Sequence, residues 1–336
     1  MKIYRSSIRE RSKEKKMILP EMNNKERSAL YVFRFLAAVV AVMGLTFAGM
    51  SAEAAAKQKG FATPEDAVKA VMTAARNNND KELIAIFGPS AKDLIFSGDA
   101  VADKERRQLL LSKYDEKNGL VPKNGDMVIV IGKDDWPLPI PLVKKGEVWS
   151  FDTNKGREEV LNRRIGGNEL DTIQTLLAVV DAQREYAIKD LDGDGVPEYA
   201  LKFMSDAGKK NGLYWKTKEG EEPSPLGEFF AGARAEGYAK HGSKQKPIPY
   251  HGYYYRMLKA QGKDAAGGAY DYVVKGKMVG GFAVIASPAK YGNSGVMTFL
   301  VNHDGVVYQK DLGKNTEKAA KAINRFDPDK TWKKVE

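Results

Sequence analysis

The feature that most constrains this chain is a change of hydrophobic period that occurs twice along its length. From Thr63 onward apolar residues recur at helical spacing, and after Gly125 they give way to strand-like runs such as MVIVI. A second helical pattern begins near residue 157, and short strand-like runs follow it from residue 253 to the hairpin sequence Asn302–Gly305. Helices followed by antiparallel strands, twice over, predict the α+β class.

Length and composition fit two small domains. The chain has 336 residues, of which 43% are hydrophobic and none is cysteine. A chain of this length buries sizeable cores without covalent cross-links. The missing cysteines exclude disulfides, thiolate metal sites, a cysteine nucleophile and a lipid-bearing N-terminal cysteine. We place the boundary at about residue 155, which gives one domain over 55–155 and another over 156–336.

Capping residues and helix breakers set the limits of the expected elements. Thr63 followed by Pro64 and two acids is typical of a helix start, and Asp80 is expected to cap the second helix. Alternate prolines at 137, 139 and 141 restrict that stretch to an edge strand or a polyproline-like segment. Gly166-Gly167 is expected to separate two helices, the second of them capped by Asn168. After the first helix, the expected helices are 81–87, 101–117, 157–164, 168–188, 226–238 and 315–326, and the expected strands are 127–131, 148–151, 253–259, 269–274, 281–286, 296–301 and 306–309.

The N-terminal residues 1–54 have the pattern of a signal peptide. Basic residues precede an apolar run of 13 residues, Phe35 to Phe47, and small residues follow it. Two overlapping A-x-A patterns predict a mature chain that starts at Ala55 or Lys57. The alternative is an uncleaved membrane anchor, but the run is shorter than the ~20 residues that span a bilayer. We therefore expect a periplasmic or secreted protein that meets the membrane only through its cleaved leader. The unusually long, charged stretch before Met22 indicates that translation begins at Met17 or Met22.

The net charge of +10 does not indicate a nucleic-acid partner. Residues 1–54 hold ten Lys/Arg and five Glu, so half of the excess belongs to the leader. The rest is spread over the mature chain, without a basic helix interleaved with aromatic residues that would follow a phosphate backbone. We expect no nucleic acid among the partners.

The strongest candidate for a ligand site is an acidic loop after the long predicted helix. Asp190, Asp192 and Asp194 occupy the first, third and fifth positions of a calcium-loop pattern, with the Val196 carbonyl at the seventh and Glu198 at the ninth. Glycines follow the second and third aspartates and allow a sharp turn. Leu201 stands where a bidentate glutamate is expected, so the pattern predicts a weak, structural Ca²⁺ site. The alternative is a solvated Asp/Gly turn.

Other chemistry-bearing residues favour structural explanations. Loop exposure is expected to account for His303, and His241 lies in a polar loop. His251 opens an aromatic run that is either a stacking surface or, as we expect, a strand with tyrosines alternating between core and rim. Acid pairs at 134–135 and 158–159 are expected to be solvated. We find no nucleophile-elbow, zinc-helix or phosphate-loop motif.

Six long segments, in order, resemble a family of exported bacterial proteins catalogued as domain of unknown function 2950. The segments are FATPEDAV, GKDDWPLPIPLVK, FDTNKGREEVLNRRIGGNEL, DAQREYAIKDLDGDGVPEYA, PYHGYYYRMLKAQG and GVMTFLVNHDGVVYQKDLG. The resemblance covers nearly all of the mature chain and implies export, but it implies no activity.

The two halves also resemble separate folds. Residues 61–153 look like a cone-shaped, nuclear-transport-factor-2-like domain, a helix-plus-antiparallel-sheet cone. Residues 168–312 are similar to the globular part of type II secretion pseudopilins, a pilin-like helix followed by an antiparallel sheet, and some pseudopilins hold calcium. The chain lacks a prepilin cleavage site before an entirely apolar helix, so assembly into a pilus-like fibre is not expected.

These observations favour a non-catalytic binding or scaffold protein whose partner is an unknown envelope protein or polymer. The competing class is a hydrolase of envelope polymers, with carboxylates in the concave face of the first domain and Trp136 and Trp149 lining that face. A convergent pocket with a buried acid would favour the enzyme, and a closed, leucine-filled cone the binder. A polymerising subunit would need an exposed apolar stripe on the helix 168–188.

Overall fold

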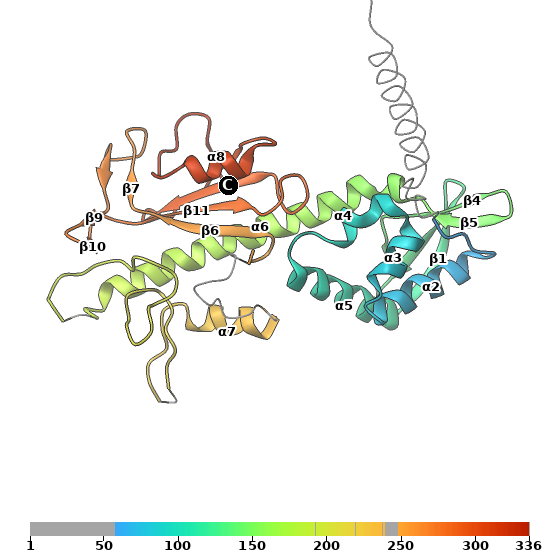
Figure 1. The fold of residues 1–336 in the computed structure, drawn as a ribbon, viewed down its shortest axis with the longest axis horizontal. Coiled ribbons are helices and arrows are strands. Elements are labelled where there is room, and N and C mark those ends of the chain that lie inside the picture. The colour runs from blue at the N-terminus through green and yellow to red at the C-terminus, as the bar shows by residue number, and fades with distance from the viewer. Residues whose placement is uncertain (1–57, 192, 219, 237, 239–247, 336) are drawn as a thin grey trace, which may run out of the picture. The chain divides into compact units, whose positions relative to one another are not determined.

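The structure is a computed structural model, and it describes residues 58–335 except 192, 219, 237 and 239–247. Residues 56–336 form one compact unit, shown as a ribbon in Figure 1. The predicted leader, 1–54, lies outside the described residues. Among the described helices, none combines the length and the apolar character that a membrane span requires. The mixture of helices and antiparallel sheets confirms the α+β class.

The first half opens with a helical layer whose caps follow from the sequence. Helix α2 begins after Thr63, whose Oγ1 accepts a hydrogen bond from the Asp66 amide at 3.1 Å. Such a cap contributes about 1 kcal/mol. The second helix is capped by Asn79 rather than Asp80, which is its first residue. The helices of this half are α2 (Pro64–Arg76), α3 (Asp80–Phe87), the short 3₁₀ helix η1 (Pro89–Ala91), α4 (Lys92–Ile95) and α5 (Ala100–Glu116).

An antiparallel sheet packs against these helices, in the order β1-β2-β4-β5, with β3 paired to β2. Its strands are β1 (Asn118–Lys123), β2 (Asp126–Ile131), β3 (Trp136–Pro137), β4 (Leu142–Lys145) and β5 (Val148–Phe151). The predicted strands at 127–131 and 148–151 are confirmed, while β1, which follows α5 after one residue, was not predicted. Alternate side chains of the sheet and the apolar faces of α2 and α3 form one buried cluster around Met72, Ile86 and Leu142.

A single helix, α6 (Thr153–Ile188), replaces the two helices expected on either side of Gly166-Gly167. The prediction of a break was wrong because tertiary contacts outweigh the low helix propensity of glycine. Asn168, expected to cap the second helix, lies inside the continuous helix and is 1% exposed. Its Nδ2 donates to the Ser294 carbonyl at 2.7 Å, so the side chain joins the helix to the second half.

The second half is built around a five-stranded antiparallel sheet in the order β14-β13-β12-β11-β6. Its strands are β6 (Tyr253–Leu258), β11 (Ala283–Pro288), β12 (Met297–Asn302), β13 (Tyr308–Asp311) and β14 (Lys333–Lys334). Shorter strands are β7 (Ala260–Gln261), β8 (Tyr270–Asp271), β9 (Val273–Val274) and β10 (Lys277–Met278), and the helices are α7 (Gly227–Glu236) and α8 (Thr316–Ala322). The predicted run 269–274 is thus divided between β8 and β9, and the last helix ends four residues before the expected Phe326.

The core of the second half lies between this sheet and the C-terminal part of α6. Leu176 and Val180 are fully or almost fully buried there, with Phe299 and Leu300 of β12. The predicted apolar stripe of the helix is therefore mostly covered, although Leu170 is 66% exposed. Consequently the continuous exposed stripe that a polymerising subunit requires is absent from the described part of this helix.

Polar side chains of α6 join the two halves. Glu169 Oε1 accepts hydrogen bonds from the Val296 and Met297 amides, both at 2.9 Å. From the first half, the buried Asp99 carboxylate accepts hydrogen bonds from the Tyr238 hydroxyl and the Gly252 amide, also at 2.9 Å. Buried hydrogen bonds of this kind fix a unique arrangement because a partner lost in the interior leaves a costly unsatisfied group.

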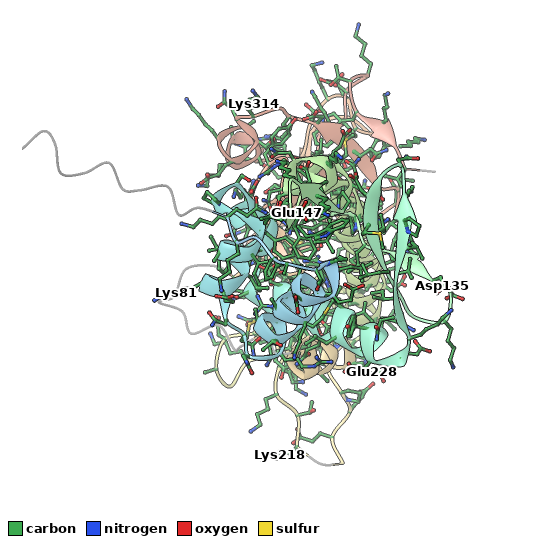
Figure 2. All side chains as sticks on the ribbon, turned by 90° about the vertical axis from the view of Figure 1, so that its right-hand side faces the viewer. Lys81, Asp135, Glu147, Lys218, Glu228 and Lys314 are labelled. Atoms are coloured by element: carbon green, nitrogen blue, oxygen red, sulfur yellow. The ribbon has the colours of Figure 1, made fainter. Side chains whose placement is uncertain are left out.

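Charged side chains extend outward from every layer, as Figure 2 shows for the labelled Lys81, Asp135, Glu147, Lys218 and Lys314. All five are exposed in the structure. The acid pairs 134–135 and 158–159 are exposed as well, as predicted for solvated charge. They do not form a catalytic pair in a cleft.

Candidate functional site

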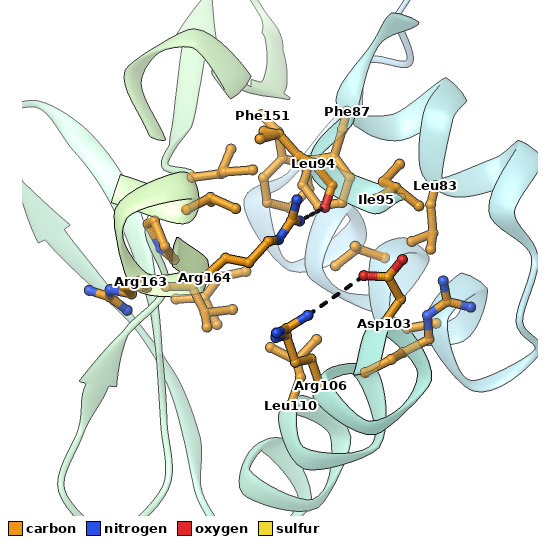
Figure 3. Close-up of a pocket in the computed structure, with 18 of the residues that line it drawn as sticks. Leu83, Phe87, Leu94, Ile95, Asp103, Arg106, Leu110, Phe151, Arg163 and Arg164 are labelled. Carbon is orange, nitrogen blue, oxygen red and sulfur yellow. Dashed lines mark hydrogen bonds and ion pairs between the residues drawn. The ribbon is translucent and has the colours of Figure 1, made fainter. Parts of the chain in front are cut away.

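The first half contains an apolar cavity of about 390 Å³. Its wall is formed by residues of α2, α3, α4, α5, β2, β5 and the start of α6. The elements that form the hydrophobic core of this half therefore also line the cavity. Phe87 and Phe151 pack together at 4.8 Å between ring centroids on one side of it (Figure 3). The aliphatic lining consists of Val71, Met72, Ala75, Leu83, Leu94, Ile95, Leu110, Ile129, Leu138, Pro139, Ile140 and Val160.

Arg164 reaches the cavity from α6 and is 7% exposed. Its Nη1 donates to the Asp93 carbonyl at 3.0 Å and to Asn293 Oδ1 at 2.8 Å, and its Nη2 donates to the Leu94 carbonyl. All three acceptors are neutral. Burial lowers the pKa of Arg164, and the neighbouring charge of Arg106 acts in the same direction, whereas Asp103 and Asp93 oppose them. Since arginine stays protonated in proteins, the cavity contains a buried positive charge.

Arg106 enters the same cavity from α5, as Figure 3 shows. One of its terminal nitrogens, Nη2, donates to Asn168 Oδ1. The other, Nη1, is buried without a hydrogen-bond partner among the described residues and lies 3.7 Å from Asp103 Oδ1. Asp103 in turn accepts a hydrogen bond from the Ser97 amide at 2.9 Å. The guanidinium of Arg106 therefore has an unused donor at the cavity.

Two further arginines line the rim but are directed to partners outside it. Arg107 donates to Asp80 Oδ1 at 2.7 Å. Arg163 donates to Glu159 at 2.6 Å and stacks over the Trp136 ring at 4.9 Å, and Figure 3 shows it extending away from Asp103 and Arg106. The cations available inside the cavity are therefore Arg106 and Arg164.

The cavity differs from both forms expected from the sequence. It is neither a closed, leucine-filled cone nor a site with paired carboxylates, because Asp103 is the one carboxylate among its lining residues. Trp136 and Trp149, expected to line the concave face, are not part of the lining. Trp136 is 56% exposed because it sits on the short edge strand β3, and Trp149 faces Phe61, with which it exchanges backbone hydrogen bonds.

The acidic loop after α6 folds as a tight turn around Asp190. The carboxylate of Asp190 accepts hydrogen bonds from the amides of residues 193, 194 and 195 at 2.9, 3.1 and 2.8 Å. Gly193 and Gly195 have φ values of +76° and +80°, the left-handed conformation that favours glycine. The two glycines thus make the predicted sharp turn.

Further contacts surround the rest of this predicted calcium loop. Asp194 accepts a hydrogen bond from the Val196 amide at 3.0 Å and forms an ion pair with Lys277. Asp192 lies outside the described residues, Val196 is exposed, and Glu198 is half-buried. Among the described residues, no group of three His, Asp or Glu side chains has metal-binding geometry. Calcium binding here therefore stays a prediction.

The two described histidines lie in different settings. His303 is only partly exposed, contrary to expectation, because its ring packs edge-on against Tyr272 at 5.7 Å. His251 lies 3.5 Å from an Asp171 oxygen and 3.6 Å from a Glu236 oxygen. His241 lies outside the described residues. In the strand after His251, Tyr253 is fully buried and Tyr254 is 39% exposed, which confirms the expected alternation.

Sequence reasoning missed Arg106 and Arg164. The available signal is the spacing of Asp103, Arg106 and Leu110, which places an acid, a base and an apolar residue on one face of a helix. That pattern is common on solvated helices. Only the packing of α6 beside α5 distinguishes this cavity-lining helix from a solvated one.

Fold and site together define an α+β protein with a largely apolar cavity lined by the buried guanidinium of Arg164 and by Arg106, whose Nη1 is buried. The chain belongs to the family described as "Protein of unknown function (DUF2950)", whose match spans residues 58–335. This match confirms the resemblance to that family drawn from the six sequence segments. Comparison with curated proteins and with solved structures gives no match.

Proposed function

We propose that this protein is an exported, non-catalytic binding protein of the cell envelope that holds an apolar small molecule in the cavity of its first half. The observation that carries the proposal is the cavity itself, a space of about 390 Å³ with an almost entirely aliphatic and aromatic wall. Ligand sites in proteins are mostly apolar clefts of about 300–1,000 Å³ with a few placed polar groups.

Export is supported by the leader pattern before Ala55, and the resemblance to nuclear-transport-factor-2-like cones agrees with a cavity between helices and a sheet. The pseudopilin resemblance of the second half, with a structural Ca²⁺ at the Asp190 loop, belongs to the same proposal. In it, the second half contacts an envelope protein or polymer. The hydrolase alternative has no comparable support, because Asp103 has no second carboxylate beside it in the lining.

The test is binding of a neutral, apolar fluorophore, N-phenylnaphthylamine, to the purified protein. We expect saturable binding with an increase in fluorescence. Ile95→Trp places a larger ring in the cavity and is expected to weaken binding at least about tenfold, which corresponds to about 1.4 kcal/mol. The matched control, Leu109→Trp, changes a residue of α5 that is 61% exposed and outside the cavity lining, so it should leave binding unchanged.

Circular dichroism measures whether both variants are folded. If Ile95→Trp does not fold, Leu138→Trp provides a second substitution in the cavity lining. Absence of saturable binding, or equal binding by the lining variants and the control, would overturn the proposal.

A further inference from the structure

The charge inside the cavity is unbalanced. Arg106 and Arg164 contribute two guanidinium groups, and Asp103 contributes the only carboxylate among the lining residues that are directed inward. The described site therefore has an excess of one positive charge against an apolar wall. A charge in such surroundings is costly unless an opposite charge and hydrogen-bond partners compensate it.

The hydrogen-bond partners of Arg164 are all neutral groups. Three of its five N–H donors are used by the Asp93 carbonyl, the Leu94 carbonyl and Asn293 Oδ1, and no described carboxylate lies within 4.0 Å of it. These contacts hold the guanidinium in place while leaving its charge unpaired. A fixed, unpaired cation of this kind is preorganised for an anion because binding it requires no rearrangement of the side chain.

Arg106 provides the second, independent observation. Its Nη1 is buried and has no hydrogen-bond acceptor in the described structure, and the nearest acid, Asp103, is at 3.7 Å, beyond hydrogen-bonding distance. An unsatisfied buried donor destabilises the folded protein, and more so when it is charged. An acceptor supplied by a ligand removes that cost.

We infer that the ligand is a long-chain carboxylate, with its anionic head at Arg106 and Arg164 and its alkyl chain along the aliphatic wall. This inference rests on the proposed function, since it names the ligand class of the same cavity. The excess of a single positive charge matches a monoanion rather than a doubly charged phosphate monoester. Guanidinium groups bind carboxylates through strong, charge-assisted hydrogen bonds, and the wall offers no second polar cluster that would match a polar tail.

The experiment compares laurate with dodecanol, which has the same chain length and an uncharged head, by displacement of N-phenylnaphthylamine. Hydrogen bonds to a charged group contribute about 1.5–3 kcal/mol, so laurate is expected to bind roughly ten- to a hundredfold more tightly. Arg106→Gln should remove most of this preference while dodecanol affinity stays within about twofold. Lys113→Gln, on the same helix but outside the cavity lining and paired with Glu116, is the matched control and should keep the preference.

The outcomes separate the two proposals. Equal binding of laurate and dodecanol overturns the carboxylate inference and leaves the apolar binding function in place. Binding of the fluorophore without displacement by either lipid also overturns the inference. Failure of the fluorophore and of both lipids to bind overturns the proposed function itself. If Arg106→Gln does not fold, Arg106→Lys is the second variant. A preference that is unchanged in Arg106→Lys, as it is in Lys113→Gln, contradicts the role of the Arg106 guanidinium.

Discussion

The ion pair between Asp93 and Arg157 links α4 to the first turn of α6, with 2.6 Å between Arg157 Nη1 and Asp93 Oδ2. The hydrogen bond from Arg157 holds the pKa of Asp93 below its usual value of 3.8. A lowered pKa in the folded state means that the pair stabilises the protein above the unfolded pKa and that this contribution is lost as the pH falls through the folded value.

We therefore predict that Asp93→Asn lowers the free energy of unfolding at about pH 6 by about 1 kcal/mol or less, because the pair is partly exposed. At a second pH well below 3.8 the difference between the variant and the original protein should be smaller, since protonation of Asp93 removes the pair as the pH falls through the folded value. Urea denaturation at the two pH values measures this difference. An equal difference at both would contradict the assignment.

At the same scale, the identity of the cavity cations could not be predicted from sequence. Arg163 and Arg164 are neighbours in an identical local context, yet one stacks on the exposed Trp136 and the other is 7% exposed. The helical period places them about 100° apart, but which side faces the core depends on where α4 and the 290–294 turn pack. The sharp turn of the Asp190 loop, by contrast, was predicted, because the positive φ of its glycines is a local requirement.

At the scale of elements, α6 contains glycines with opposite roles. Gly156 approaches the loop before β4 so closely that a Cβ would lie 2.6 Å from the Pro139 carbonyl oxygen. Gly166 and Gly167 are exposed, and a Cβ at either would meet no atom within 4 Å. We predict that Gly166→Ala and Gly167→Ala each raise the free energy of unfolding by about 0.5–1 kcal/mol, because alanine favours the helix.

Gly156→Ala serves as the contrasting variant and should lower the same free energy by roughly 1–3 kcal/mol through overpacking. Chemical denaturation measures all three variants. Destabilisation by Gly166→Ala or Gly167→Ala would indicate that the helix bends there in solution, as the sequence alone predicts.

The loop after α6 supports a separate prediction about calcium. For a site with Kd of about 10⁻⁴ M, about 2 mM Ca²⁺ stabilises the folded protein by about 1.8 kcal/mol. Thermal unfolding with calcium and with a chelator should therefore differ by a few degrees. Asp194→Ala also breaks the ion pair with Lys277, so the comparison is the calcium effect within each variant rather than the absolute Tm. An unchanged calcium effect in Asp194→Ala, or none in either protein, contradicts the site.

Most elements of the first half and the main strands of the second were predictable, because caps and apolar periods are local. The unpredicted strand β1 reads NGLVPK, with a glycine and a proline that disfavour a strand, and it forms because six residue pairs align it with β2. Continuity of α6 through two glycines likewise depends on contacts at Asn168 and Glu169 with residues more than 120 positions away. Contacts between residues so far apart in the chain cannot be recognised from the local sequence pattern.

At the scale of the whole molecule, export is the testable property. We predict that the protein recovered from a periplasmic or secreted fraction begins at Ala55 or Lys57 and lacks the apolar run 35–47. Intact-mass measurement and N-terminal sequencing provide the readout. A membrane-bound chain that retains the run would contradict cleavage and favour the uncleaved anchor.

The shared use of Arg164 has a thermodynamic consequence for the molecule. The same guanidinium lines the cavity and donates to Asn293 of the second half. Any ligand that strengthens or weakens this hydrogen bond changes the free energy with which the 290–294 turn is attached to α6. Coupling between two sites is reciprocal. A partner that binds this turn would therefore change the affinity of the cavity for its ligand by the same factor by which the ligand changes the affinity of the turn for the partner. One side chain thus couples occupancy of the cavity to the attachment of the 290–294 turn.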